Sequence, residues 1–319
     1  MTGWRHRRCY RRPIRASAPL IGAAPERQDH RLRLADRRML GYAEYGDPHG
    51  WPLIFLHGFP GSRLAGSVLD EAARAGAVRV LAPERPGIGL STPQPERTLL
   101  DHAQDVRALA EQLGIGRFAV LGESGGGPYA LACAHELRDR VGCVAVVCGL
   151  GRVAGPGATE GIALKERIGY AIAARMPKLA GRALVPIAAW ARHRPRQFLR
   201  LTCWQLGEAD RQALQGPLGD LVAADFAEAF RQGGCGVAHD LELLFGPWPF
   251  EPSAIRTPVI FLHGERDRTV SVAAARALAS HVPDAQLRIW QQHGHFSLLP
   301  FEAHNVLAEL ARQHPGGRP

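Results

Sequence analysis

The chain lacks several features that define large classes of protein. Its 319 residues contain no apolar run long enough to span a membrane, because the longest candidate, 179–191, is short and includes Arg182 and Pro186. The six cysteines form no C-x-x-C pair and no metal-binding spacing, so we expect buried reduced thiols and no metal site. No Gly-Lys-Ser or Gly-Lys-Thr follows a glycine-rich segment, which argues against a phosphate-binding loop. Stable membrane insertion is therefore not expected.

Lysine is also scarce, and the basic residues are mostly arginines. The net charge is +9, but residues 1–25 hold six arginines and no acid, so subtracting six from nine leaves only +3 for the rest. No aromatic interleaving or recognisable reading helix accompanies the basic residues, so nucleic acid is not an expected partner. Residues 1–28 lack apolar periodicity and a secretory h-region, so we expect a disordered basic extension and a cytoplasmic protein.

Two parts of the chain, 29–150 and 252–319, alternate short apolar runs with helical periodicity. We expect a β-hairpin around 35–38, strands at 53–56, 78–82, 118–121, 143–148, 258–263 and 286–290, and helices at 62–75, 99–113, 129–137, 272–281 and 301–313. Such alternation predicts an α/β fold, with a mostly parallel central sheet and helices on both faces.

The segment 151–251 interrupts this alternation. It contains amphipathic helical stretches broken by prolines, and no strand pattern. We expect an inserted helical cap, or lid, over the carboxyl edge of the sheet, where ligands bind in such folds. Its many apolar residues between Ile162 and Leu206 suggest a hydrophobic acyl or alcohol group in the substrate, although most of them should pack the cap on the core.

Ser124 is the strongest candidate for a catalytic residue. It lies between the apolar run 118–121 and the helical pattern from Tyr129, so a strand turns into a helix at this serine. Gly122 and Gly126 complete the pattern G-x-S-x-G of a nucleophile elbow, in which small residues permit a strained turn that lifts the hydroxyl clear of the sheet. The alternative is a small-residue turn with an idle serine.

An acid and a histidine follow two later strands. Asp267 comes after the strand 258–263, and His295 comes after the strand 286–290. The carboxyl ends of parallel strands lie at one edge of a sheet, so both residues should lie beside Ser124, in the chain order Ser, Asp, His. Three rivals stay open: Glu265 and Asp240 for the acid, and His293 for the base.

Together these segments resemble the α/β-hydrolase fold superfamily, in its serine-nucleophile, cap-bearing, esterase-like branch. The resemblance covers roughly 32–312 and rests on the segments 57–61 (HGFPG), 85–91 (RPGIGLS), 122–127 (GESGGG), 264–267 (GERD) and 294–296 (GHF). It implies a Ser124–His295–Asp267 triad and a cap inserted after the sixth strand. The loop 85–91 is expected to be a structural turn beside the site.

Acyl transfer also needs donors for the oxyanion. We expect the residue after the nucleophile, Gly125, to supply one backbone N–H, and Phe59, in the loop after the third strand, to supply the other. We therefore expect a serine hydrolase, without metal or organic cofactor, that cleaves a small or medium apolar carboxylic ester or a lactone. Its partner is then a small-molecule substrate. The sequence does not distinguish this activity from that of a C–C bond hydrolase or a proline-iminopeptidase-like enzyme, which would use the same triad. It also leaves open a non-catalytic binding protein and the oligomeric state.

Overall fold

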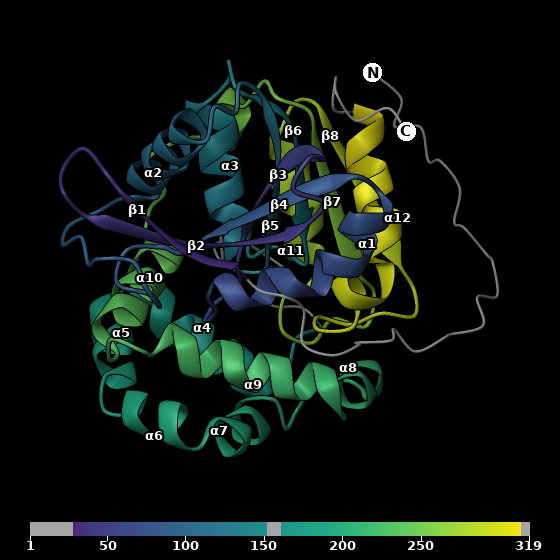
Figure 1. The fold of residues 1–319 in the computed structure, drawn as a ribbon. Helices are drawn as coiled ribbons and strands as arrows, with labels where there is room; N and C mark the ends of the chain where they lie inside the picture. The colour runs from purple at the N-terminus through teal and green to yellow at the C-terminus, as the bar shows by residue number, and fades with distance from the viewer. Residues whose placement is uncertain (1–27, 152–160, 314–319) are drawn as a thin grey trace.

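The computed structural model describes residues 28–151 and 161–313. Its centre is an eight-stranded sheet in the order β1-β2-β4-β3-β5-β6-β7-β8 (Figure 1). Strands β1 and β2 form the expected antiparallel hairpin, β2 also runs antiparallel to β4, and all remaining neighbours are parallel. The strands are β1 Gln28–Arg33, β2 Met39–Gly46, β3 Trp51–Leu56, β4 Val78–Pro83, β5 Phe118–Glu123, β6 Val141–Val147, β7 Val259–Gly264 and β8 Ala285–Trp290.

Helices cover both faces of the sheet, which confirms the predicted α/β fold. Helices α2 (Leu99–Gln112), α3 (Gly126–Glu136) and α11 (Val272–His281) pack on one face, and α1 (Asp70–Ala75) and α12 (Leu298–Gln313) pack on the other (Figure 1). Each face has its own apolar core. Along β3, for example, Ile54 and Leu56 point into the first core, whereas Leu53 and Phe55 point into the second, as alternation along a strand requires.

Several helix boundaries differ from the sequence prediction; helix α3, for example, begins at Gly126 instead of 129. The single helix expected at 62–75 is a 3₁₀ helix, η1 (Arg63–Leu69), followed by α1, and Ser62 accepts a hydrogen bond from the N–H of Leu64 as its cap. Helix α12 begins at Leu298 instead of 301, because a proline in the first turn, here Pro300, does not break a helix. Gln28 already belongs to β1, and the rest of the expected N-terminal extension lies outside the described residues.

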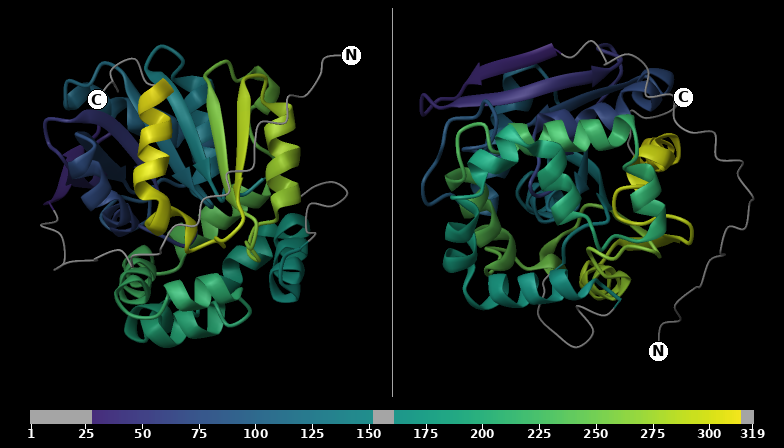
Figure 2. Two further views of the ribbon diagram at one scale, coloured as in Figure 1. Left: turned by 90° about the vertical axis from the view of Figure 1, so that its right-hand side faces the viewer. Right: turned by 90° about the horizontal axis from the view of Figure 1, so that it is seen from below.

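Between β6 and β7 the described residues form helices and no strand. These helices, called here the helical block, are α4 Leu164–Arg175, α5 Pro177–Leu184, α6 Ala188–His193, α7 Pro195–Thr202, α8 Glu208–Ala213, α9 Pro217–Ala229 and α10 Cys235–Phe245. Most of them lie at one end of the sheet, below it in Figure 1 and in the left view of Figure 2. The described residues contain no helix with both the length and the apolar character needed to cross a bilayer.

The expectation of buried thiols holds only in part. Cys133, Cys143 and Cys148 are buried without a disulfide bond, in agreement with it. Cys203 is half-buried and Cys235 is exposed, which the sequence prediction did not anticipate. Cys235 is the first residue of α10, and helical periodicity turns the following apolar residues, such as Val237, toward the interior instead.

Candidate active site

Ser124 occupies a strained turn between β5 and α3. Its φ angle is +50°, in the left-handed region that residues with a side chain rarely adopt. Glycine is required on both sides: a Cβ at Gly122 would lie 2.4 Å from the carbonyl oxygen of Gly126, and a Cβ at Gly126 would lie 2.0 Å from that of Leu56. The G-x-S-x-G pattern is therefore a direct consequence of how closely this turn approaches its neighbours.

The structure brings Ser124, His295 and Asp267 together in one chain of hydrogen bonds. The hydroxyl of Ser124 lies 2.9 Å from Nε2 of His295, in the loop between β8 and α12. On the other side of the ring, Nδ1 of His295 lies 2.8 Å from Oδ2 of Asp267, in the loop after β7. This arrangement allows the imidazole to take the hydroxyl proton while the carboxylate stabilises the resulting positive charge.

Asp267 is held as a carboxylate by four donors. Its Oδ1 accepts the backbone N–H groups of Thr269 and Val270, at 2.8 and 2.9 Å. Its Oδ2 receives His295 and also lies 3.3 Å from Nε2 of His263. Burial by itself raises the pKa of Asp267, but the charge of His295 and the hydrogen bonds from both histidines outweigh it, and the pKa lies well below its usual value. Asp267, the acid of this hydrogen-bond chain, is therefore ionised.

His295 is correspondingly easy to protonate. Burial lowers the pKa of its imidazole, but the charge and hydrogen bond of Asp267 outweigh that effect. The carboxylates of Asp210 and Glu123 act in the same direction, and together they raise the pKa to about 9. The site is thus arranged to stabilise an imidazolium, the form that appears when the serine proton is transferred.

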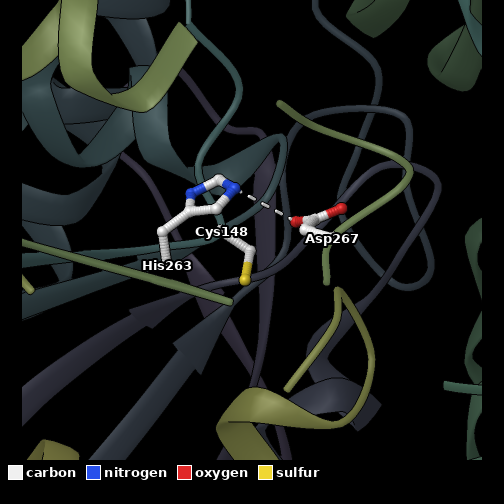
Figure 3. A group of neighbouring side chains, drawn as sticks. All are labelled: Cys148, His263 and Asp267. Carbon is white, nitrogen blue, oxygen red and sulfur yellow. Dashed lines mark ion pairs between the residues drawn. The ribbon is translucent and has the colours of Figure 1, made fainter. Parts of the chain in front are cut away.

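Cys148, His263 and Asp267 form a buried group whose donor atoms lie close enough together for a metal ion (Figure 3). Their bonds do not suit a metal. Nε2 of His263 faces two acceptors, Asp267 and the carbonyl oxygen of Val270 at 3.0 Å, so it carries a hydrogen. The Cys148 thiol lies 3.7 Å from the carbonyl oxygen of Gly294, and burial raises its pKa. We therefore interpret the group as support for Asp267.

The rivals for the triad positions have other surroundings. Glu265 is exposed to solvent. Asp240, in α10, is buried against Arg85 and Arg97, at 2.8 and 2.9 Å. The ring of His293 lies 2.9 Å from the carboxylate of Glu302 in α12. None of these three makes a hydrogen bond to Ser124 or His295 within the described residues.

The two expected oxyanion donors are neighbours. A Cβ built on Gly125 would lie 3.2 Å from the backbone nitrogen of Phe59, and Phe59 lines the same pocket as Ser124. Arg85 supports this loop: it donates to the carbonyl oxygens of His57 and Gly58, at 2.7 and 2.8 Å. From the sequence, Arg85 was expected only as part of a structural turn, and nothing in its pattern predicted this contact.

A small pocket of about 60 Å³ opens beside Ser124. The helical block contributes α9 to its wall, through Leu218, Leu221, Val222 and Phe226. The apolar residues between Ile162 and Leu206, expected to suit a hydrophobic substrate group and to pack the core, do not line this pocket. Several of them are exposed: Leu164, Ile168, Ile172, Leu179, Leu201 and Trp204. Exposed side chains do not pack the helical block on the core, so the expected role in packing is wrong for these six residues.

Two carboxyl groups also line the pocket, and neither was expected there from the sequence. Glu123 directly precedes Ser124, and no hydrogen bond to its side chain is found within the described residues; burial raises its pKa to about 7. Asp225, in α9, accepts hydrogen bonds through Oδ1 from the N–H and hydroxyl of Ser62, at 2.8 and 2.6 Å. Burial outweighs these bonds and raises its pKa to about 7 as well. Near pH 7 each carboxyl group can therefore be neutral or ionised, and a positive charge on a substrate would favour the ionised form.

A model of the alpha/beta hydrolase fold family matches residues 52–301. The chain therefore belongs to this family. Among curated proteins, it is 34% identical to a proline iminopeptidase of Xanthomonas citri over 115 residues, which make up 34% of this chain and 36% of that protein. A second proline iminopeptidase, of Xylella fastidiosa, is 36% identical over 110 residues, or 33% of this chain and 34% of that protein. These matches span only about a third of the relatives' length.

Solved structures agree in fold over most of the chain. A thermophilic esterase from Thermogutta terrifontis superposes with a TM-score of 0.63 at 22% identity, covering 90% of this chain and 99% of that one. A hydrolase from Pseudomonas aeruginosa superposes with a TM-score of 0.66 at 17% identity, covering 91% and 98%. At such low identity the likeness shows the shared α/β-hydrolase fold.

Proposed function

We propose that this protein is a serine hydrolase that cleaves a small or medium apolar carboxylic ester or a lactone. The observation that carries this proposal is the continuous hydrogen-bond chain from Ser124 through His295 to Asp267, which begins at a strained turn beside a largely apolar pocket. In this proposal the helical block, within 151–251, is the cap that covers the site.

The reaction proceeds through an acyl-enzyme. Ser124 attacks the acyl carbonyl carbon while its proton passes to Nε2 of His295, and Asp267 stabilises the imidazolium. The backbone N–H groups of Phe59 and Gly125 receive the negative charge that develops on the carbonyl oxygen. His295 then gives the proton to the leaving alcohol. Water, deprotonated by His295, attacks the acyl-enzyme; the bond from the acyl carbon to Ser124 breaks, and the imidazolium returns its proton to the serine oxygen as the acid leaves.

A second candidate function is an aminopeptidase of the proline-iminopeptidase type, acting on the same triad. Two observations favour it: the carboxyl groups of Glu123 and Asp225 in the pocket, and the similarity to curated proline iminopeptidases. A protonated amine on the substrate would compensate the charge of these carboxylates, which a neutral ester cannot do. The two candidates therefore differ in the charge of the group that enters the pocket.

One experiment tests the nucleophile. A p-nitrophenyl ester series from acetate to decanoate is hydrolysed by the wild type and by Ser124→Ala, His295→Ala and the control Ser280→Ala, each also treated with a fluorophosphonate probe. Ser280 is an exposed residue of α11, far from Ser124 in sequence. We expect turnover and labelling in the wild type and control, and loss of both in the other two. If no variant differs from the wild type, the triad assignment is wrong.

A second substrate series separates the two functions. Prolyl and alanyl p-nitroanilides are compared with their N-acetylated forms, which lack the positive charge. Preference for the free amine, lost in Glu123→Gln, would favour the aminopeptidase. Labelling by the fluorophosphonate without turnover of either series would point to C–C bond substrates, and neither labelling nor turnover would support a non-catalytic binding protein.

A further inference from the structure

Asp210, in helix α8, binds the loop that carries His295. It is fully buried, and its Oδ2 accepts the backbone N–H of His295 at 2.8 Å. Its Oδ1 accepts the backbone N–H groups of Phe296 and Ser297, both at 3.0 Å, and the hydroxyl of Ser297 at 2.9 Å. One carboxylate of the helical block thus receives four hydrogen bonds from three consecutive residues of the loop.

Gly294 shows how closely the loop approaches this carboxylate. A Cβ at Gly294 would lie 2.3 Å from Oδ2 of Asp210 and 2.5 Å from Oδ1. The φ angle of Gly294 is not in the left-handed region, so its backbone conformation alone does not demand glycine. The hydroxyl of Ser297 also accepts the N–H of Gly294 at 2.8 Å, which closes the loop around Asp210.

The helical block also contacts the loops on the other side of Ser124, but less directly. Asp225 holds Ser62, which follows the oxyanion loop, and Asp240 holds Arg85, which in turn binds His57 and Gly58. Asp210 alone among these aspartates bonds the backbone of a triad residue. Its charge also acts on the ring of His295, together with those of Asp267 and Glu123.

We infer that Asp210 is a positioning residue for His295, so that the helical block is a part of the catalytic framework and not only a cover over the substrate. This inference rests on the proposed serine hydrolase. Asp210 fixes the backbone from which the imidazole reaches Ser124, and its negative charge supports the imidazolium formed during acyl transfer. A block displaced from the sheet would release the histidine loop and stop turnover.

The first test is Asp210→Asn, with Asp220→Asn as the matched control on an exposed part of α9. The asparagine keeps one oxygen acceptor, but its NH₂ group must face the N–H of His295, and the charge is lost. We expect kcat to fall roughly 10- to 100-fold with little change in KM. The acid limb of kcat/KM should move to lower pH, because loss of a nearby anion lowers the pKa of His295.

A merely structural role would lower the amount of folded enzyme without moving the pH profile. The lower pKa of His295 expected in Asp210→Asn can also be measured without substrate, by following the imidazole in a pH titration of ¹⁵N-histidine-labelled protein. We expect a lower midpoint in Asp210→Asn and an unchanged one in Asp220→Asn. An unchanged kcat, pH profile and titration midpoint in Asp210→Asn would overturn the inference. If the wild type itself shows no turnover, only the proposed function is refuted, because the titration midpoint still tests the contact between Asp210 and His295.

Gly294→Ala gives a second test, in which the side chain of Asp210 is kept. Its added Cβ displaces the carboxylate of Asp210, so kcat should fall roughly 10-fold or more in the otherwise native protein. In an Asp210→Ala background the Cβ meets no carboxylate, and the same substitution should reduce kcat much less. Equal effects in both backgrounds would show that Asp210 does not act on this loop. An unchanged kcat in Gly294→Ala alone would also overturn the inference, whether or not variants of Asp210 fold.

Discussion

Arg85 and Asp240 form a buried ion pair with a distance of 2.8 Å between Nη2 and Oδ2. The pair joins the loop after β4 to helix α10, and Asp240 also receives Arg97 at 2.9 Å and the hydroxyl of Tyr129 at 2.5 Å. Arg85 in turn donates to two carbonyl oxygens of the expected oxyanion loop. A single buried carboxylate therefore links the helical block to the loop that contains Phe59.

Removal of this carboxylate should be costly. Asp240→Asn leaves the guanidinium groups of Arg85 and Arg97 buried without a counter-charge, and breaking such a pair typically costs about 3–5 kcal/mol. We expect the free energy of unfolding in urea to fall by roughly that amount and fluorophosphonate labelling to slow. Asp220→Asn on the surface of α9 serves as the control. Unchanged stability would mean that the pair is not formed in solution.

The contact between Gly125 and Phe59 predicts a steric effect on catalysis. Gly125 has a φ of −60°, which alanine also adopts, but its Cβ would lie 2.6 Å from that of Phe59. Gly125→Ala should therefore push the oxyanion loop away and lower kcat by about 10²–10³, the usual effect of losing one oxyanion donor. Gly116→Ala is the control, because no atom lies within 4 Å of a Cβ there. Steady-state kinetics showing the same kcat for both variants would contradict the assigned donor pair.

The surroundings of His295 predict an alkaline pH dependence. Only the neutral imidazole can accept the serine proton, and the pKa of His295 lies above its ordinary value of 6.5. Activity should therefore rise with pH through a midpoint above 6.5. Asp267→Asn removes the main anion, so the midpoint should move to lower pH while kcat falls by roughly 10⁴. A pH series of kcat/KM for both enzymes checks this, and an unshifted midpoint would exclude Asp267 as the acid.

Substitution of Glu123 is expected to raise the free energy of unfolding by an amount that depends on pH. Burial raises the pKa of its carboxyl from 4.5 to about 7, so the ionised form is disfavoured in the folded protein. The wild type then loses stability as the pH rises from about 4.5 to about 7, and this stability is not regained at higher pH. Glu123→Gln should be more stable than the wild type by about 1–2 kcal/mol at pH 8 and should lose this advantage near pH 4. Urea unfolding at both pH values measures it, and a pH-independent difference would contradict the shift.

Much of the fold and part of the candidate site follow from local sequence patterns. Apolar runs predict the strands, and their alternation with helical periodicity predicts the mostly parallel sheet. The glycines around Ser124 mark the strained turn, because only residues without a Cβ fit there. Asp267 and His295 each follow a strand directly in the sequence, which predicts them as the partners of Ser124. The structure brings these three residues together.

Other features depend on tertiary packing alone. The sequence favours Asp267 but leaves Glu265 and Asp240 as rival carboxylates, and only the fold exposes Glu265 and buries Asp240 against arginines. Asp210 and His295 are 85 residues apart, and Arg85 and Asp240 are 155 apart. Helical and strand periodicity report only on neighbours along the chain, whereas these contacts arise when the helical block packs on the sheet edge. The sequence by itself thus determined the strands, the serine turn and the candidate triad, and only the packed structure decided which carboxylates hold it in place.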